Sequence, residues 1–339
     1  MNGYITFAAA RATQAEQLGE AVPRIADQLA ERAALGRLAG PGPVLVGIGA
    51  SYAAACAPVW ALRSRGIHSW RLSAGDYPLP FPPSTHPIVG ISQSGRSAET
   101  LAALESLPEE LRYAVVNTEP SPIASISPTL SLGSLRDSYA STLGYTATVA
   151  ALGMLADSWD GGAPDAGWSR LAATFAEVED RLTAPVSDLA GLFADVSSSD
   201  FVGAGPAVGS AEAGALLFRE VARIPATGMS TRQYLHGSME SAGDGVHVVL
   251  GDSRELDLAT TLADAGHHVV LVSSEEISAS RTLHPVRLPK LPAAQRAVLE
   301  ALVLQILVGA VADVRGIDIE EFVFHNADTK VPVDAGSAA

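Results

Sequence analysis

The sequence predicts an α/β protein with two doubly wound halves, each a parallel sheet flanked by helices. Short apolar runs alternate with helical stretches in the first and last thirds of the chain, which is typical of parallel sheets covered on both faces. A strand–Gly-x-Gly–helix outline also occurs twice, at 43–64 and 199–221. This repetition indicates an internal duplication.

Apolar periodicity and turn residues place the elements of the first half. The N-terminal helix is expected to be interrupted near Pro23, because proline removes a helical hydrogen bond. Gly66 is the expected C-cap of the next helix. The expected elements are a helix over 13–38, a strand over 44–49, a helix over 51–66, strands over 69–74 and 88–92, a helix over 98–107 and a strand over 113–117.

Helices then separate this half from a second alternating region. We expect one long helix over 138–159, one or two more over 168–193, strands over 200–205, 246–251 and 269–274, and helices over 207–224, 253–267 and 296–316. The expected division is an N-terminal helical segment (1–40), a first α/β domain (41–160), a helical linker (161–195), a second α/β domain (196–325) and a C-terminal tail (326–339).

Composition excludes several classes of function. The chain has 339 residues with 37 acidic and 22 basic side chains, so its net charge of −15 argues against binding to nucleic acid or to anionic membranes. Cys56 is the only cysteine, which rules out an intrachain disulfide and a cysteine-based zinc site. The N-terminus lacks the pattern of a signal peptide. We expect no apolar run of membrane-spanning length, since the most apolar run carries Glu300 and Asp313. We therefore expect a soluble, cytoplasmic protein.

The stretch Ser92-Gln93-Ser94-Gly95-Arg96-Ser97 joins an apolar strand to a helix. Ligands of doubly wound sheets bind where strands end, and a helix N-terminus favours an anion. Three hydroxyls, an amide and a glycine at such a junction predict a phosphate site built from neutral donors. The alternative is that Ser94 or Ser97 only caps the helix.

The turn Gly-Ile-Gly-Ala-Ser over 47–51 is a second junction of this kind. A dinucleotide fingerprint would need a third glycine where Tyr52 stands, and an acidic residue about twenty positions on, which is absent. We interpret Ser51 as a further hydroxyl that faces the same ligand.

Candidate acid–base groups lie in the second half. Glu220 ends an otherwise apolar helix, where desolvation can tune a carboxylate as a base; the alternative is an ion pair with Arg219 or Arg223 on a solvated face. His236 beside Gly237 is a candidate proton shuttle, although a single histidine is more often structural. No further cluster has the spacing of metal ligands.

Lysine is nearly absent from the chain. Only Lys290 and Lys330 occur, and the remaining positive charge is arginine. A lysine amine can form an imine with a ketose carbonyl, which arginine cannot. Lys330 is therefore either a catalytic group or an exposed residue of the tail.

These motifs resemble those of proteins with two SIS (sugar isomerase) domains, over about residues 10 to 333. The closest likeness is to the isomerase half of glutamine–fructose-6-phosphate aminotransferase and to stand-alone amino-sugar-phosphate deaminases and isomerases. The turn over 47–52 resembles the family's Gly-x-Ser-Tyr turn, 92–97 its phosphate loop, and 212–241 its second-half catalytic stretch.

The resemblance implies a role for each matching residue. Glu220 would move a proton between C1 and C2, His236 would open the sugar ring from the neighbouring subunit, and Lys330 would form the imine. It implies a homodimer with shared sites and needs no cofactor or metal. The residues implied to bind sugar and phosphate are Ser51, Ser92, Gln93, Ser94, Ser97 and Ser141.

The chain departs from the family pattern in ways that concern its substrate. It carries no glutaminase domain, which favours deamination or isomerisation over synthesis. Leu217 stands in place of a lysine of the family, and Ser238 in place of a proline. Arg96 replaces an acidic residue of the phosphate loop, and its guanidinium is a candidate for a salt bridge to the phosphate. We expect a sugar-phosphate isomerase or deaminase that interconverts compounds like glucosamine 6-phosphate and fructose 6-phosphate. The alternatives are a deglycase acting on a sugar-phosphate–amino acid adduct and a non-catalytic sugar-phosphate-binding protein.

Overall fold

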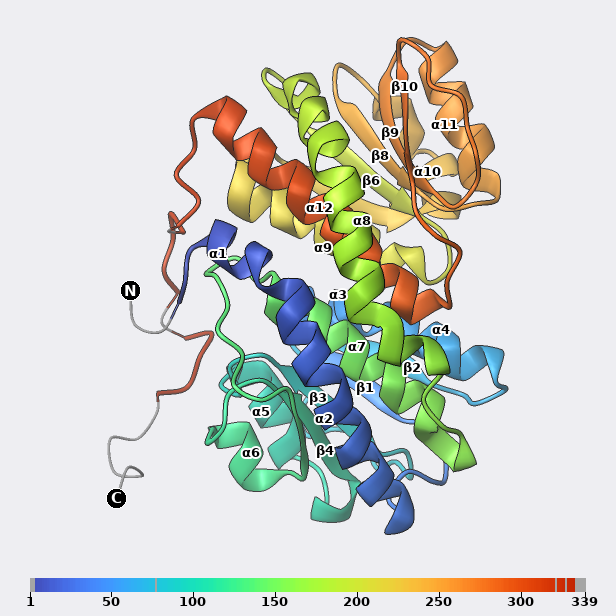
Figure 1. The fold of residues 1–339 in the computed structure, drawn as a ribbon. Coiled ribbons are helices and arrows are strands. Elements are labelled where there is room, and N and C mark those ends of the chain that lie inside the picture. The colour runs from blue at the N-terminus through green and yellow to red at the C-terminus, as the bar shows by residue number, and fades with distance from the viewer. Residues whose placement is uncertain (1–3, 77, 321, 327, 333–339) are drawn as a thin grey trace.

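Two parallel five-stranded sheets form the framework of the chain (Figure 1). The computed structural model describes residues 4–76, 78–320, 322–326 and 328–332. The first sheet has the order β2-β1-β3-β4-β5 and consists of Trp70–Ser73, Val44–Gly47, Ile88–Ser92, Arg112–Val116 and Thr129–Ser131. The second has the order β10-β9-β8-β6-β7 and consists of Leu283–Arg287, His268–Ser273, Val246–Leu250, Ser199–Gly203 and Ala226–Ser230.

The two sheets share one topology. In each, the first strand lies between the second and the third, and the fourth and fifth follow outward. All strand pairs are parallel, with Val44 opposite Ile88 in the first sheet and Ser199 opposite Val246 in the second. The predicted fold class and the internal duplication are thus confirmed.

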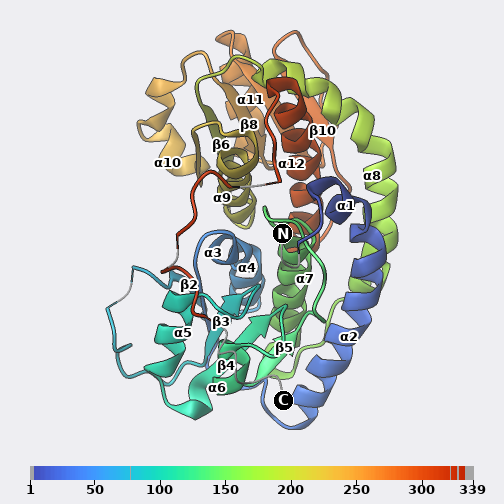
Figure 2. The ribbon, with the colours of Figure 1, turned by 90° about the vertical axis from the view of Figure 1, so that its left-hand side faces the viewer.

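Helices surround both sheets and join the halves. Figure 2 shows α8 and α2 along one side of the molecule, with α7 and α12 inside. The α-helices are α1 (Phe7–Ala12), α2 (Gln14–Ala34), α3 (Ala50–Ala54), α4 (Cys56–Ser64), α5 (Ala98–Glu105), α6 (Pro122–Ile126), α7 (Leu143–Ser158), α8 (Leu171–Ser187), α9 (Ala207–Leu217), α10 (Thr231–Leu235), α11 (Arg254–Asp264) and α12 (Ala293–Arg315). Short 3₁₀ turns span Glu109–Leu111, Trp159–Gly161, Ala166–Arg170, Asp188–Phe193 and Ser238–Ser241, and Phe218–Ala222 forms a π-turn.

The core depends on two helices without a solvent face. Every residue of α7 except Asp157 is buried, and α12 packs against α7, α8 and α9. A helix that is apolar all round must be enclosed by protein or by lipid. We expected no apolar run of membrane-spanning length, and this expectation was wrong, because α12 is long and apolar enough. Most of α12 is buried between the halves, as befits the core helix of a globular protein.

Several element boundaries differ from the prediction. Pro23 lies inside a continuous α2, and the break comes earlier, at Thr13. The helix expected over 51–66 is divided at Ala55. The sequence analysis missed three strands, β5, β7 and β10, which are short and partly polar. They lie at the edges of the sheets, so they lack the continuous apolar run that predicts a buried strand.

The helix expected over 138–159 begins only at Leu143, and Asp137 explains why. Its carboxylate is buried and accepts hydrogen bonds from the backbone N–H groups of Thr142, Leu143 and Gly144 at 2.9–3.2 Å. It also accepts from the Ser141 hydroxyl at 2.7 Å. A negative side chain that satisfies the free amides of a helix N-terminus fixes where the helix starts. Ser141 is therefore held in a loop rather than in the helix.

Gly153 tests how tightly α7 is packed. A Cβ atom on it would lie 2.6 Å from Ala294 Cβ and 2.6 Å from the Trp168 ring. We expect Gly153→Ala to lower the free energy of unfolding by about 1–3 kcal/mol, because overpacking outweighs the helix propensity of alanine. Urea denaturation measures the change. Gly191→Ala is the matched control, since its Cβ would meet no atom within 4 Å, and equal stability of both variants would contradict the prediction.

Candidate active site

The loop over 93–97 joins β3 to α5, as the sequence indicated. Gly95 has a φ of +63°, and a Cβ atom there would collide with the Ser121 side chain, so the turn requires glycine. The hydroxyls of Ser92 and Ser97 lie 2.9 Å apart. Ser97 occupies the N-cap position of α5, yet its side chain makes no capping hydrogen bond. Simple capping therefore does not account for this hydroxyl.

The C-terminal segment runs from α12 to this loop (Figure 2). Ala98 N–H donates to the Thr329 carbonyl at 3.2 Å, and Val331 N–H donates to the Arg96 carbonyl at 2.9 Å. Arg96 Nε donates to the Val331 carbonyl at 2.7 Å, so the guanidinium binds the C-terminal segment. An antiparallel bridge then pairs Ser97 with Lys330. The lysine that the sequence singled out thus lies beside the phosphate loop, although 233 positions separate it from Ser97 in the numbering.

A cavity of about 300 Å³ lies at the boundary between the halves. It brings together Ser141, from the loop before α7, and Glu220, from the π-turn after α9. Gly49 and Ala50 also line it, and they immediately precede the half-buried Ser51. The lining residues are Ile48, Gly49, Ala50, Tyr139, Ser141, Tyr145, Ala213, Gly214, Leu216, Leu217, Glu220, Ala301, Leu304, Gln305 and Phe322.

Gln93 links the phosphate loop to the start of α7, whose neighbours Ser141 and Tyr145 line the cavity. A Cβ atom on Gly144 would lie 2.9 Å from Gln93 Nε2 and 2.6 Å from the Asp137 carboxylate. The Gln93 amide therefore lies against the N-terminus of α7, next to the Ser141 loop.

Glu220 has no countercharge among the described residues. Burial disfavours its ionised form and raises its pKa to about 7. Among the described residues neither neighbouring arginine pairs with it: Arg219 donates to the Ala226 carbonyl and Arg223 to the Asp318 carbonyl. The alternative of a solvated ion pair is thus not what the structure shows. The π-turn and the left-handed Arg223 that ends it set the side chain apart from the regular helix.

His236 does not reach this cavity within one chain. It is the C-cap residue of α10 and is exposed, and it is not among the residues that line the cavity. The buried Tyr234 anchors α10, since its hydroxyl lies 3.3 Å from both the Asp200 carboxylate and His247 Nδ1. A role for His236 through a neighbouring subunit remains a prediction.

Sequence reasoning missed three polar residues of the cavity. Tyr139, Tyr145 and Gln305 lie in apolar or irregular stretches that carry no motif. Tyr145 in particular looks like an ordinary core residue of α7. Burial raises the pKa of its hydroxyl, so the group is a neutral donor.

The loop of the second half that corresponds to 93–97 carries different side chains. It follows β8 and contains Asp252, which accepts hydrogen bonds from Ser273 Oγ at 2.7 Å and Ser274 Oγ at 2.8 Å and pairs with Arg296. A carboxylate repels an anion, and its arginine partner is already engaged. Among the described residues, this loop of the second half thus presents a carboxylate where the 92–97 loop is expected to offer neutral hydroxyl donors.

Comparison with known proteins identifies the fold. No family model and no curated protein matches the chain. The C-terminal domain of glucosamine-fructose-6-phosphate aminotransferase from Francisella tularensis superposes with a TM-score of 0.78 at 18% identity, over 94% of this chain and 99% of that one. Tagatose-6-phosphate ketose/aldose isomerase from Escherichia coli gives 0.76 at 17% identity, over 95% and 97%.

A glucosamine-6-phosphate deaminase from Thermotoga maritima superposes with a TM-score of 0.71 at 20% identity, over 93% of this chain and all of that one. Identities this low establish a common fold. Because these structures span nearly the whole chain, the likeness includes both sheets and the helices between them. The chain has the two-domain SIS fold.

Proposed function

We propose that the protein is a sugar-phosphate isomerase that acts on an amino-sugar phosphate and releases its nitrogen. The observation that carries this proposal is Glu220, an unpaired carboxyl with a pKa of about 7 in a cavity next to the phosphate loop. A base poised near neutral pH is what transfer of a carbon-bound proton needs. We assign the imine-forming amine to Lys330, an exposed residue outside the cavity lining whose backbone pairs with Ser97 of the phosphate loop.

The phosphate binds to the loop through neutral donors. Ser94 and Ser97 offer hydroxyls and Gln93 offers an amide at the N-terminal end of α5, while the buried Ser92 hydroxyl is hydrogen-bonded to that of Ser97. Hydrogen bonds to a charged group are stronger than those between neutral groups. This arrangement explains how an acidic protein holds an anionic substrate without a basic pocket.

The chemistry then proceeds in three steps. With the ring opened, Glu220 takes the proton from C2 of the amino aldose and returns it to C1, which leaves an imine at C2. The Lys330 amine adds to this imine and ammonia departs. Water hydrolyses the resulting lysine imine to the ketose phosphate, so the net reaction consumes one water and releases one ammonia.

A homodimer completes this site. His236 is exposed on α10 and lies outside the cavity of its own chain, which supports its donation to the neighbouring subunit as the group that opens the ring.

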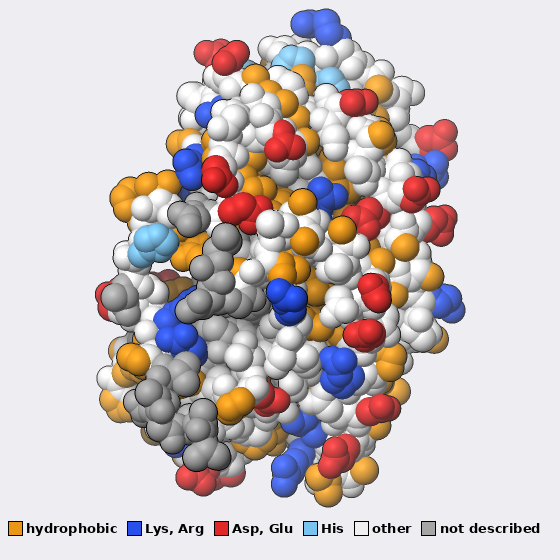
Figure 3. All heavy atoms as spheres, turned by 60° about the vertical axis from the view of Figure 1, so that its left-hand side comes forward, with side chains coloured by type: hydrophobic (Ala, Val, Ile, Leu, Met, Phe, Trp, Pro, Cys, Tyr) orange, Lys and Arg blue, Asp and Glu red, His pale blue; other side chains and the backbone are white. Residues whose placement is uncertain are grey.

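Acidic and basic side chains are interspersed on the face of the molecule that Figure 3 shows, so this face has no continuous positive surface that would attract a polyanion.

Ser94 tests the phosphate loop. Its hydroxyl is half-buried and makes no hydrogen bond within the part of the chain that is described. We expect Ser94→Ala to weaken fructose 6-phosphate binding by about 1–2 kcal/mol, measured by titration calorimetry. Ser125→Ala, on the exposed face of α6, is the control. An unchanged dissociation constant would mean that the loop does not hold the phosphate.

Glu220 predicts the pH dependence of proton transfer. The carboxylate is the active form of a base, so exchange of the C2 proton of glucosamine 6-phosphate in D₂O is expected to rise with pH and level off above about 7. Glu220→Gln is expected to slow the exchange by about 100-fold or more. Proton NMR measures both. A flat profile, or equal loss in the exposed control Asp264→Asn, would refute the assignment.

Lys330 predicts a covalent intermediate. Reduction by borohydride in the presence of fructose 6-phosphate is expected to attach the sugar to Lys330 alone, and mass spectrometry identifies the modified residue. Lys330→Ala is expected to lose this adduct and turnover while it keeps sugar-phosphate binding. Lys290, the only other lysine and an exposed one, provides the control. Full turnover of Lys330→Ala would remove the imine from the mechanism.

A further inference from the structure

Five polar side chains among the described residues line the cavity between the halves, and two of them already have partners elsewhere. Both ends of the Gln305 amide are engaged, since Oε1 accepts from Gln14 Nε2 at 2.7 Å and Nε2 donates to the Thr142 carbonyl at 3.2 Å. The Tyr139 hydroxyl lies 3.2 Å from His325 Nδ1. The other three polar side chains of the lining are Ser141, Tyr145 and Glu220. What each of these can still offer determines which ligand fits.

Ser141 can only accept a hydrogen bond from a ligand. Its hydroxyl donates its single proton to the Asp137 carboxylate at 2.7 Å. That carboxylate also accepts from the Thr142 hydroxyl at 2.8 Å and from the backbone N–H groups over 142–144. Because every one of these neighbours donates to Asp137, the direction of the Ser141 hydroxyl is fixed. Only the lone pairs of Ser141 Oγ remain for a ligand.

Tyr145 offers the opposite polarity. The residue is only 7% exposed, its hydroxyl makes no hydrogen bond within the described part of the chain, and the oxygen is not among the fully enclosed polar atoms that lack a partner. The hydroxyl is therefore open to the cavity that Tyr145 lines. Burial raises the pKa of this hydroxyl, which keeps its proton in place. Tyr145 thus has a free donor.

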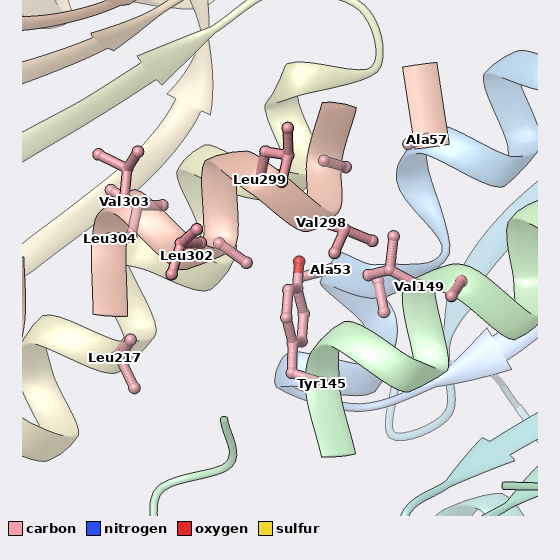
Figure 4. Packing of buried hydrophobic residues seen from close by; sticks show 14 of the residues in the cluster. Ala53, Ala57, Tyr145, Val149, Leu217, Val298, Leu299, Leu302, Val303 and Leu304 are labelled. Carbon is pink, nitrogen blue, oxygen red and sulfur yellow. The ribbon is translucent and has the colours of Figure 1, made fainter. Parts of the chain in front are cut away.

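The surroundings of Tyr145 would suit phenylalanine equally well if the ring only filled space. Figure 4 shows the ring projecting from α7 towards α12, with Ala53 and Val298 among the apolar side chains around it. A buried hydroxyl without a partner costs free energy, and phenylalanine has the same shape without that cost. This unpaired donor therefore points to a ligand as its partner.

The two polarities fit the reacting end of an open-chain amino aldose. Its C1 carbonyl oxygen can only accept a hydrogen bond, and its C2 ammonium group can only donate. These two groups sit on adjacent carbon atoms, and Ser141 and Tyr145 lie four positions apart at the start of α7. Glu220 then remains available for the carbon-bound proton.

We propose that Tyr145 and Ser141 form a donor–acceptor pair that recognises the reacting end of the substrate, with Tyr145 on the oxygen of C1 and Ser141 on the nitrogen of C2. The inference rests on the proposed function. It adds Tyr145 as a ligand-binding residue and gives Ser141 a polarity that Asp137 imposes. A hydrogen bond from Tyr145 also stabilises the negative charge that develops on this oxygen when the proton leaves C2.

Three sugar-alcohol phosphates test the pair by titration calorimetry. The complete ligand is 2-amino-2-deoxyglucitol 6-phosphate; its 1-deoxy analogue lacks the oxygen on C1, and 2-deoxyglucitol 6-phosphate lacks the nitrogen on C2. None has a carbonyl group, so neither ring closure nor an imine contributes to binding. We expect the complete ligand to bind about threefold to tenfold more tightly than the 1-deoxy analogue, and at least about tenfold more tightly than 2-deoxyglucitol 6-phosphate. Equal affinities would overturn the inference.

Tyr145→Phe isolates the donor, because it keeps the ring and removes only the hydroxyl. We expect it to weaken binding of the complete ligand by about threefold to tenfold and to leave binding of the 1-deoxy analogue unchanged. Tyr113→Phe is the matched control, since it removes a half-buried tyrosine hydroxyl outside this cavity. An equal loss for both ligands, or no loss for either, would contradict the role of Tyr145.

Ser141→Ala isolates the acceptor. We expect it to abolish the preference for the complete ligand over 2-deoxyglucitol 6-phosphate. Ser274→Ala is the matched control, because the Ser274 hydroxyl also donates to a carboxylate, that of Asp252 at 2.8 Å, but lies outside the cavity lining. A preference that survives in Ser141→Ala would refute the role of Ser141. If Ser141→Ala loses its cooperative melting curve, the wild-type ligand series and Tyr145→Phe still decide the inference.

The ligands also separate this inference from the proposed function. Equal binding of all three would refute the pair and leave the sugar-phosphate site standing. Absence of binding by all three would refute that site, and the inference with it. The expected discrimination without exchange of the C2 proton of glucosamine 6-phosphate would support the pair and refute the proposed reaction.

Discussion

The buried carboxylate of Asp137 at the N-terminus of α7 is the interaction on which the site depends. It satisfies the free amides of Thr142, Leu143 and Gly144 and holds the Ser141 hydroxyl. Buried backbone N–H groups without hydrogen-bond partners at a helix N-terminus would destabilise the fold. The contact with Asp137 therefore determines where α7 starts. The Gln93 amide packs against the same turn, so the 93–97 loop and the Ser141 loop both contact the start of α7.

The position of Glu220 follows from the second constraint, the enclosure of α7 and α12. Both helices are apolar on nearly every side, so they pack against each other and bring the two halves together around them. The end of α9 thereby faces the loop before α7. A carboxyl placed at this boundary loses hydration without gaining a partner, and its raised pKa is the consequence. The proposed base is a product of packing between the halves.

The recognisable motifs predicted the fold class and selected several residues of the candidate site. Periodicity and the repeated Gly-x-Gly outline led to two parallel sheets, and the structure confirms them. The serine-rich junction, Glu220 and Lys330 were selected from residue type and spacing. The edge strand β5 was missed because its three residues carry no clear alternation. Tyr145 was missed because a tyrosine in an apolar helix has no distinguishing local pattern.

The sequence by itself determined the fold class, the turn at Gly95 and the choice of neutral donors at the loop, because these follow from local periodicity, backbone geometry and residue chemistry. Only the tertiary structure decided that the backbone of Lys330 pairs with Ser97, that Glu220 has no ion-pair partner in the described part of the chain, and that the cavity around it is lined mainly by hydrocarbon. These features join residues distant in the chain. They depend on which side chains the packing of two halves leaves together, and local sequence carries no record of that.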